Sequence, residues 1–170
     1  MPASLHGRAM KDEPAAAEDD LRSGEVTVAL PPQIDAGVYF IGTIRTPWRT
    51  RGECPKRGSP DGPICSIVVD ERWRAALTDL ANHRRIQVLY WMHRARRDLV
   101  LQTPFRTGQT TGSFALRSPV RPNPIASSIV NLVAIEGTML RVRGLDCLDG
   151  TPLIDLKPER GVSDQAGSGP

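Results

Sequence analysis

The segment Arg117–Pro124 combines two arginines and an asparagine with three prolines, and this combination favours anion binding. Each proline fixes its own φ and moves the preceding residue out of the α region, so the segment is predicted to be a loop. Because such a loop has little conformational freedom to lose, its guanidinium groups are ready for a carboxylate or phosphate. Arg117 is the candidate ligand-binding arginine. The alternatives are a surface Arg117 paired with a carboxylate and an Asn123 that bonds its own turn.

A second group of candidate residues places three carboxylates within ten residues, beside a tight turn. Its members are Asp146, Asp149, Gly150, Thr151 and Asp155. Such a turn can offer backbone groups to an adenine ring and a carboxylate to a ribose diol or a cationic sulfonium. Alternatively, Asp149-Gly150 closes a hairpin and Asp155 caps a strand edge. From the residues alone, this structural interpretation is favoured.

His93 ends an apolar run and is followed by Arg94. A lone histidine at a strand end is more often structural than catalytic. The three cysteines form no CxxC pair, and the three histidines show no ligand spacing with them, so no metal site is predicted.

Short apolar runs separated by turn residues indicate that these candidates are held by strands. We expect strands over Val38–Arg45, Ile64–Val69, Ile86–His93, Leu99–Gln102, Gly112–Leu116, Ser128–Glu136, Met139–Arg143 and Leu153–Leu156. One helix is expected over Glu71–Leu80, with Asp70 as its N-cap and Trp73, Ala76, Leu77 and Leu80 on its apolar side. Turns at Glu136-Gly137 and Asp149-Gly150 favour an antiparallel meander. The predicted fold is mainly β, a small antiparallel β-barrel with one or two short helices.

Composition sets the wider limits. The chain has 170 residues and a formal charge of +3, which fits one domain of ordinary hydrophobicity. We expect a flexible arm over residues 1–25, the barrel domain over 26–160 and a flexible tail over 161–170. The cysteine count and the absence of a long apolar run favour a cytoplasmic protein without a membrane span. Basic clusters at Arg45–Arg57, Arg84-Arg85 and Arg94–Arg97 are compatible with an RNA partner or with a solvated basic face.

Three ordered blocks of sequence resemble the YaeB-like family, also called TsaA-like. They are Ile41–Trp48, Gly112–Ile125 and Gly144–Pro158, so the resemblance covers roughly residues 38 to 158. It implies a β-barrel, a homodimer with the cofactor near the interface, and S-adenosyl-L-methionine as cofactor. The residues that it implies at the cofactor are Pro55, Lys56, Arg57, His93, Arg94, Arg117, Ile129, Leu148, Asp149, Gly150 and Thr151.

The implied activity is methylation of N6 of threonylcarbamoyl-adenosine beside the tRNA anticodon. A sulfonium is already an activated methyl donor, so the protein must mainly align the acceptor, exclude water and accept one proton. Asp149 or Asp155 could accept that proton, and the sequence does not decide between them. Two alternatives stay open: a non-catalytic barrel that binds an adenosine-containing ligand, and a methyltransferase for a different acceptor.

Overall fold

A computed structural model describes residues 21–159, and these divide into two compact units. The hairpin unit contains residues 21–30 and 96–122, and the barrel unit contains residues 31–95 and 123–159. The range predicted as one barrel domain, 26–160, therefore contributes to both units. The predicted tail and residues 1–20 of the predicted arm lie outside the described residues.

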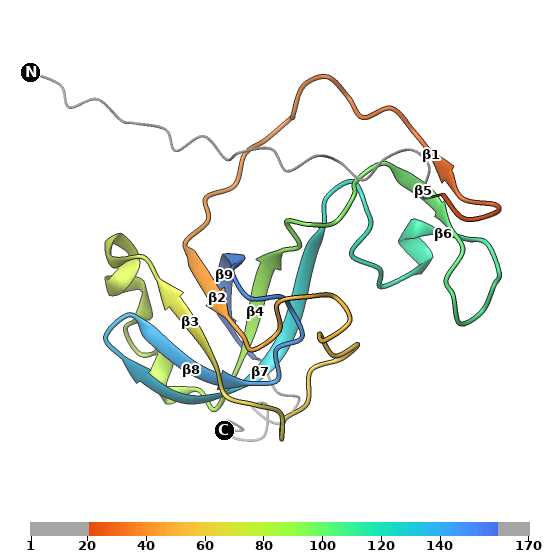
Figure 1. Cartoon of the computed structure of the whole chain (residues 1–170). Coiled ribbons are helices and arrows are strands. Elements are labelled where there is room, and N and C mark those ends of the chain that lie inside the picture. The colour runs from red at the N-terminus through yellow and green to blue at the C-terminus, as the bar shows by residue number, and fades with distance from the viewer. Residues whose placement is uncertain (1–20, 160–170) are drawn as a thin grey trace, which may run out of the picture. The chain divides into compact units, whose positions relative to one another are not determined.

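Six strands form the barrel unit (Figure 1). They are β2 (Gly42–Arg45), β3 (Cys65–Val69), β4 (Arg85–Trp91), β7 (Ile125–Glu136), β8 (Met139–Arg143) and β9 (Thr151–Pro158). The barrel closes in the order β2-β3-β8-β7-β4-β9, and every pair of neighbouring strands is antiparallel. The predicted antiparallel β-barrel is confirmed.

Alternating apolar residues along these strands form the barrel core. In β4, for example, Ile86, Val88 and Tyr90 are buried and the residues between them face outward. Side chains of a strand alternate between its two faces, so this period of two sends one apolar set inward. Inward residues of the other five strands, together with Leu145 and Cys147, complete the core.

The turn predictions are right about the turns and partly wrong about the topology. Gly137, with φ of 64°, makes the β7–β8 hairpin, in which Glu136 pairs with Met139. Gly150, with φ of 79°, lies in the second turn, but that turn closes no hairpin. The strand after it, β9, pairs with β2 and β4 and not with β8, so the strands are not a simple meander. The residues of a turn do not determine which distant strands the next strand pairs with.

Several element predictions need correction. β2 begins at Gly42, so Val38–Ile41 is not strand, and Gly112–Leu116 is mostly a short 3₁₀ turn. The expected α-helix is two 3₁₀ segments, η2 (Glu71–Leu77) and η3 (Leu80–Asn82), and the Asp70 side chain makes no capping bond. Asp79 in the left-handed region separates the segments. The apolar pattern still holds in part, since Trp73, Leu77 and Leu80 pack on the core.

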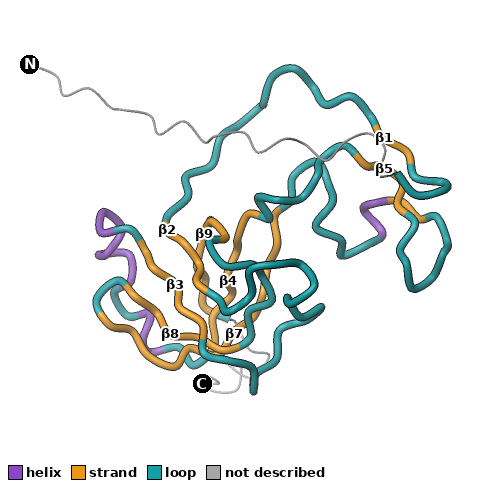
Figure 2. Tube along the Cα trace, in the orientation of Figure 1, coloured by secondary structure: helices purple, strands orange, loops and turns teal. Residues whose placement is uncertain are grey.

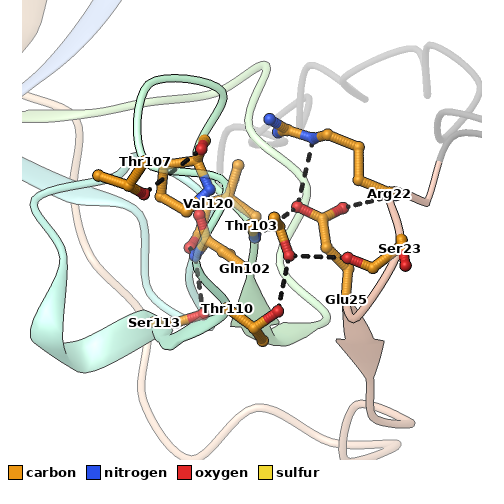
Figure 3. A network of polar contacts seen from close by, with 10 residues as sticks. Arg22, Ser23, Glu25, Gln102, Thr103, Thr107, Thr110, Ser113 and Val120 are labelled. Atoms are coloured by element: carbon orange, nitrogen blue, oxygen red, sulfur yellow. Dashed lines mark hydrogen bonds and ion pairs between the residues drawn. The ribbon is translucent and has the colours of Figure 1, made fainter.

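A three-stranded sheet in the order β1-β5-β6 forms the hairpin unit (Figure 2). Its elements are β1 (Val26–Thr27), β5 (Leu99–Gln102), β6 (Thr111–Gly112) and η4 (Ser113–Ala115). A polar network holds the sheet together (Figure 3). Gln102 donates to Ser113 Oγ and to the Val120 carbonyl, at 2.7 Å each, and Ser113 Oγ donates to the Leu99 carbonyl. This small unit is therefore stabilised by buried hydrogen bonds as well as by apolar packing.

The proline-rich segment is a loop, as predicted, and Arg121 is a structural part of it. The Arg121 guanidinium donates to the carbonyls of Ser118, Ser113 and Leu116. Three backbone acceptors on one guanidinium close the loop on itself. Arg121 is therefore committed to the fold.

A substitution at Gly42 tests the close packing of β2 against β3. A Cβ at Gly42 would overlap the Val68 carbonyl and lie 2.9 Å from Val69 Cα, where only backbone could move. We expect Gly42→Ala to lower the free energy of unfolding by about 1–3 kcal/mol, the usual effect of overpacking. Denaturant titration measures this. Gly37→Ala is the control, because its Cβ would meet nothing within 4 Å. Equal stability of the two variants would contradict the packing argument.

Candidate functional site

Strand register brings three of the predicted site segments to the same end of the barrel. Ile44 near the end of β2 pairs with Thr151 at the start of β9, and Trp91 at the end of β4 pairs with Ile125 at the start of β7. We call this end the rim, formed by residues 46–64, 92–95, 123–124 and 144–150. The rim contains Pro55–Arg57, His93-Arg94 and most of the Leu148–Thr151 turn.

The Leu148–Thr151 turn is fixed to the end of β2. The Asp149 amide donates to the Trp48 carbonyl at 2.7 Å, and the Gly150 amide donates to the Ile44 carbonyl at 2.9 Å. The amide and the hydroxyl of Thr151 both donate to the Leu148 carbonyl, and Thr151 is buried. The three backbone amides of this turn, which the sequence analysis considered as ligand contacts, thus donate to carbonyls of the protein itself. What the turn presents is its rigid shape, the Leu148 side chain and the Asp149 carboxylate.

The two candidate proton acceptors occupy different places. Asp149 Oδ1 accepts from the Thr46 amide at 3.2 Å, Oδ2 lies 3.7 Å from Arg45 Nη1, and the side chain is 35% exposed at the rim. Asp155 pairs across the ladder with the outward-facing Leu89, so it lies on the outer wall of the barrel. Its oxygens contact the Leu156 amide and the Lys157 ammonium, at 2.9 and 3.0 Å.

Asp146, to which sequence reasoning assigned no role of its own, ties the rim together. Its Oδ1 accepts from the Tyr90 hydroxyl at 2.7 Å and the Ser128 hydroxyl at 3.0 Å. Its Oδ2 accepts from the Gly58 amide at 3.2 Å, and its carbonyl accepts from the Cys54 thiol at 2.9 Å. One residue thus joins β4, β7 and the loop that carries Pro55–Arg57. The available signal was a polar residue, Ser128, at an inward position of β7.

Burial keeps the hydroxyl and thiols around Asp146 protonated. Burial, together with the Asp146 charge, raises the pKa of Tyr90 above its usual range. Burial also raises the pKa of Cys54 and Cys147, and that of Cys65 to about 11. At neutral pH these groups are therefore a phenol and thiols, and Tyr90, Cys54 and Cys65 donate hydrogen bonds. None of them is an activated nucleophile, since the reactive form of cysteine is the thiolate.

Pro55 and Arg57 line a cavity of about 150 Å³ with Trp48, Gly144 and Leu145, among others. Arg57 and the neighbouring Lys56 are exposed. This cavity adjoins the fixed turn, because the Trp48 carbonyl is the acceptor of the Asp149 amide. Pro55–Arg57 and Leu148–Thr151 therefore belong to one neighbourhood of the rim.

His93 and Arg94 follow β4 in a turn at the rim. The Met92 amide donates to the Pro124 carbonyl at 2.8 Å, and the His93 amide to the Trp91 carbonyl at 2.8 Å. Arg94 is exposed. Ile129 lies on β7 opposite Gln87, on the outer wall, with 39% of its surface exposed. Ile129 is therefore beside the rim and not part of it.

Arg117 belongs to the hairpin unit. It is exposed and lines a cavity of about 420 Å³ whose other residues include Gln102, Phe105 and Ser118. With residues 21–159, Arg117 forms no hydrogen bond or ion pair. Its guanidinium is thus available to an anion, in contrast to that of Arg121.

Between residues 21 and 159, no three histidine, cysteine, aspartate or glutamate side chains converge to hold a metal ion. Within the same range, no helix is long and apolar enough to cross a membrane.

Known proteins are similar to this chain in sequence. A probable S-adenosyl-L-methionine-binding protein, VirR, of Rhizobium radiobacter is 50% identical over 143 residues, which cover 84% of this chain and 82% of VirR. A mouse tRNA (adenine(37)-N6)-methyltransferase is 43% identical over 58 residues, which cover 34% of this chain and 14% of the mouse protein.

Solved structures share the fold. The crystal structure of TrmO from Pseudomonas aeruginosa superposes with a TM-score of 0.62 at 26% identity, covering 81% of this chain and 62% of the TrmO chain. This chain thus spans less than two thirds of that protein. The family model for the tRNA-methyltransferase O N-terminal domain matches residues 43–165. The chain therefore belongs to the tRNA-methyltransferase O N-terminal domain family.

Proposed function

We propose that this protein binds S-adenosyl-L-methionine and transfers its methyl group to N6 of threonylcarbamoyl-adenosine next to the tRNA anticodon. The observation that carries the proposal is the rim, where Pro55–Arg57, His93-Arg94 and Leu148–Thr151 meet at one end of the barrel. The cofactor, the acceptor base and tRNA are those for which the relatives are named. A tRNA substrate would place the protein in the cytoplasm.

The residues suit the chemistry of this cofactor. S-adenosyl-L-methionine has a carboxylate, a sulfonium cation, a ribose diol and an adenine ring. Arg117, with no partner in the described chain, suits the carboxylate. The partly exposed carboxylate of Asp149 suits the diol or the cation, and Leu148 and Ile129 offer apolar contact. When bound, the cofactor supplies an activated methyl group.

Asp149 is our candidate for the proton acceptor. An adenine exocyclic amine is a weak nucleophile, and a carboxylate that takes its proton helps as positive charge develops. Asp149 is at the rim, and the Thr46 amide and Arg45 orient its carboxylate. Asp155 lies on the outer wall and is engaged by Lys157. The same bonds that orient Asp149 also hold its turn, so binding and proton transfer would share one rigid segment.

We also propose that the protein is a homodimer. The outer wall of β7 exposes Ile125, Ile129 and Val133, which recur on one face of the strand. Trp91 of β4 pairs with Ile125 on the same face. An apolar outer wall of this kind is typical of a surface that a second subunit covers. Ile129 would then bring this interface beside the cofactor.

Transfer of radiolabel from S-adenosyl-L-methionine to tRNA tests the proposal. Bulk tRNA from cells with and without threonylcarbamoyl modification serves as substrate. Label on the modified tRNA alone is the expected result. Cofactor binding without label on any RNA would favour a non-catalytic adenosine-ligand-binding barrel. Methyl transfer to another acceptor would support the proposed cofactor site but would show that the methyl acceptor is a different molecule.

Arg117 should dominate recognition of the cofactor carboxylate. We expect Arg117→Ala to weaken S-adenosyl-L-methionine binding by about 1.5–3 kcal/mol, the usual contribution of a charge-assisted bond. Arg117→Lys should recover only part, since an ammonium cannot make the planar bidentate contact. Calorimetric titration measures both. Arg106→Ala, a change of an exposed arginine in the same unit, should leave affinity unchanged. Equal losses at Arg106 and Arg117 would indicate a general charge effect.

Asp149 and Asp155 make a matched pair for the proton acceptor. We expect Asp149→Asn to lower the methyl-transfer rate about 100-fold or more, the scale of general-base catalysis. Asp155→Asn should stay close to the parent. Single-turnover rates at saturating cofactor, with melting temperatures alongside, separate chemistry from folding. A large loss at Asp155 with normal turnover at Asp149 would reverse the assignment.

The salt dependence of tRNA binding should identify the arginines that meet phosphate. Arg96 is paired with Asp98, and Arg85 with Glu159, so these members of the basic clusters are engaged within the fold. Arg49 and Arg51 are exposed on the rim. We expect the double change Arg49→Ala/Arg51→Ala to reduce the log–log salt slope by about 0.7–0.9 for each phosphate that the protein no longer neutralises.

The matched control removes the same charge from the opposite end of the barrel, with Arg72→Ala/Arg84→Ala. Filter binding at several salt concentrations gives both slopes. Cofactor affinity should be unchanged in both variants. A slope that changes equally with either pair would argue against the rim as the RNA-facing end.

A further inference from the structure

Phe105 is almost entirely exposed and is stacked against an arginine. The residue is 94% exposed, in the loop between β5 and β6, and the Arg22 guanidinium carbon lies 5.4 Å from the ring centroid. Because the Phe105 side chain is not buried, it contributes no hydrophobic stabilisation to the fold. A cation on one ring face leaves the other face open to a planar partner.

A single carboxylate holds both halves of this pair in place. Glu25, whose side chain is 2% exposed, accepts from the Arg22 amide at 3.1 Å and lies 3.4 Å from Arg22 Nε. It also accepts from the Thr103 amide at 3.0 Å, at the base of the loop that carries Phe105 (Figure 3). The Thr103 hydroxyl donates to the Ser23 carbonyl and contacts Thr110 Oγ1. The arginine and the aromatic loop are thus fixed to one buried anchor.

The loop itself is tightly turned. The amides of Thr107 and Gly108 both donate to the Pro104 carbonyl, at 3.1 and 2.9 Å, and Gly108 has φ of 61°. Phe105 therefore projects from a folded loop and not from a loose one. A side chain held outward in this way loses little freedom when a partner stacks on it.

The charge of the unit favours a polyanion. Residues 21–30 and 96–122 contain six arginines and two carboxylates, a formal charge of +4, whereas the whole chain carries +3. Both carboxylates, Glu25 and Asp98, are already paired with arginines. Arg106, next to Phe105, and Arg117, on the same cavity, are exposed. An aromatic ring among arginines is the usual surface for unpaired bases and their phosphates.

We propose that Phe105 and Arg22 form a stacking platform for an unpaired nucleobase of RNA. This inference rests on the proposed function only in identifying that RNA as the tRNA substrate. The ring stacks on the base, Arg22 supports the ring from behind, and the neighbouring arginines contact phosphates. The platform would select a loop over a duplex, because paired bases do not offer their faces.

Fluorescence anisotropy with two labelled RNAs tests the platform: a stem–loop with an unpaired loop, and a duplex of the same stem. We expect Phe105→Ala to weaken stem–loop binding by about 5- to 150-fold, the effect of removing one stacked base. Duplex binding should hardly change, and Phe105→Trp should retain the preference. Phe114→Ala is the matched control, because Phe114 is also exposed, at 83%, but has no arginine over its ring among the described residues. Melting temperatures verify that each variant is folded.

Other outcomes would overturn the platform. If Phe105→Ala binds the stem–loop like the parent, no base stacks there. If it instead dissociates a dimer in sedimentation analysis with RNA affinity unchanged, the ring serves a protein contact. Methyl transfer to tRNA, measured in parallel, separates the two hypotheses. If the parent protein methylates tRNA but Phe105→Ala does not alter RNA binding, the platform is refuted and the proposed activity stands. If stem–loop binding depends on Phe105 but the parent protein methylates no tRNA, the proposed activity is refuted and the platform stands.

Discussion

The Asp146 carboxylate is the interaction on which the barrel rim depends. It is partly buried, so it must be satisfied by donors, and the donors come from β4, β7 and the loop at Gly58. Removing one of these partners would leave a charged acceptor without full compensation, which is more costly than losing an ordinary hydrogen bond. The segments that carry Pro55–Arg57 and Leu148–Thr151 are consequently fixed relative to each other. Their relative position is set before any ligand binds, so a ligand at the rim would not have to order these two segments.

Much of the fold was predictable because local sequence patterns determine many of its strands and turns. The period of two in β4 and the glycine of the β7–β8 hairpin are local signals, and both predict the observed structure. The placement of β9 was not predictable in this way, since pairing with β2 and β4 depends on residues far apart in the chain. The segment after Asp70 has the apolar spacing of a helix, yet the left-handed Asp79 divides it into 3₁₀ pieces. Spacing reports which side is buried and not which hydrogen bonds form.

The candidate site was predicted mainly through resemblance, and the structure changes what individual residues can do. Thr151 is buried beneath its turn, and the turn amides already have acceptors within the fold, so the polar group that the turn still exposes is the Asp149 carboxylate. Arg117 and Arg121 lie in the same proline-rich segment, and only Arg117 was selected as a candidate ligand-binding residue. In the structure Arg121 closes its own loop, whereas Arg117 is unpaired within the described residues. The three carbonyls that accept from Arg121 could not be identified from the sequence, because their directions depend on the folded loop. The cofactor roles of these residues stay predictions.

The position of β9 has a consequence for how the chain folds during synthesis. β9 lies between β2 and β4, so these two early strands each keep an open edge until residues 151–158 have been made. Open strand edges are templates for pairing with other chains. Until then the growing sheet carries two such edges, and pairing of β9 converts an open sheet into a closed barrel. Long-range closure of this kind is slow, so a cell that makes this protein quickly would benefit from chaperones that cover those edges.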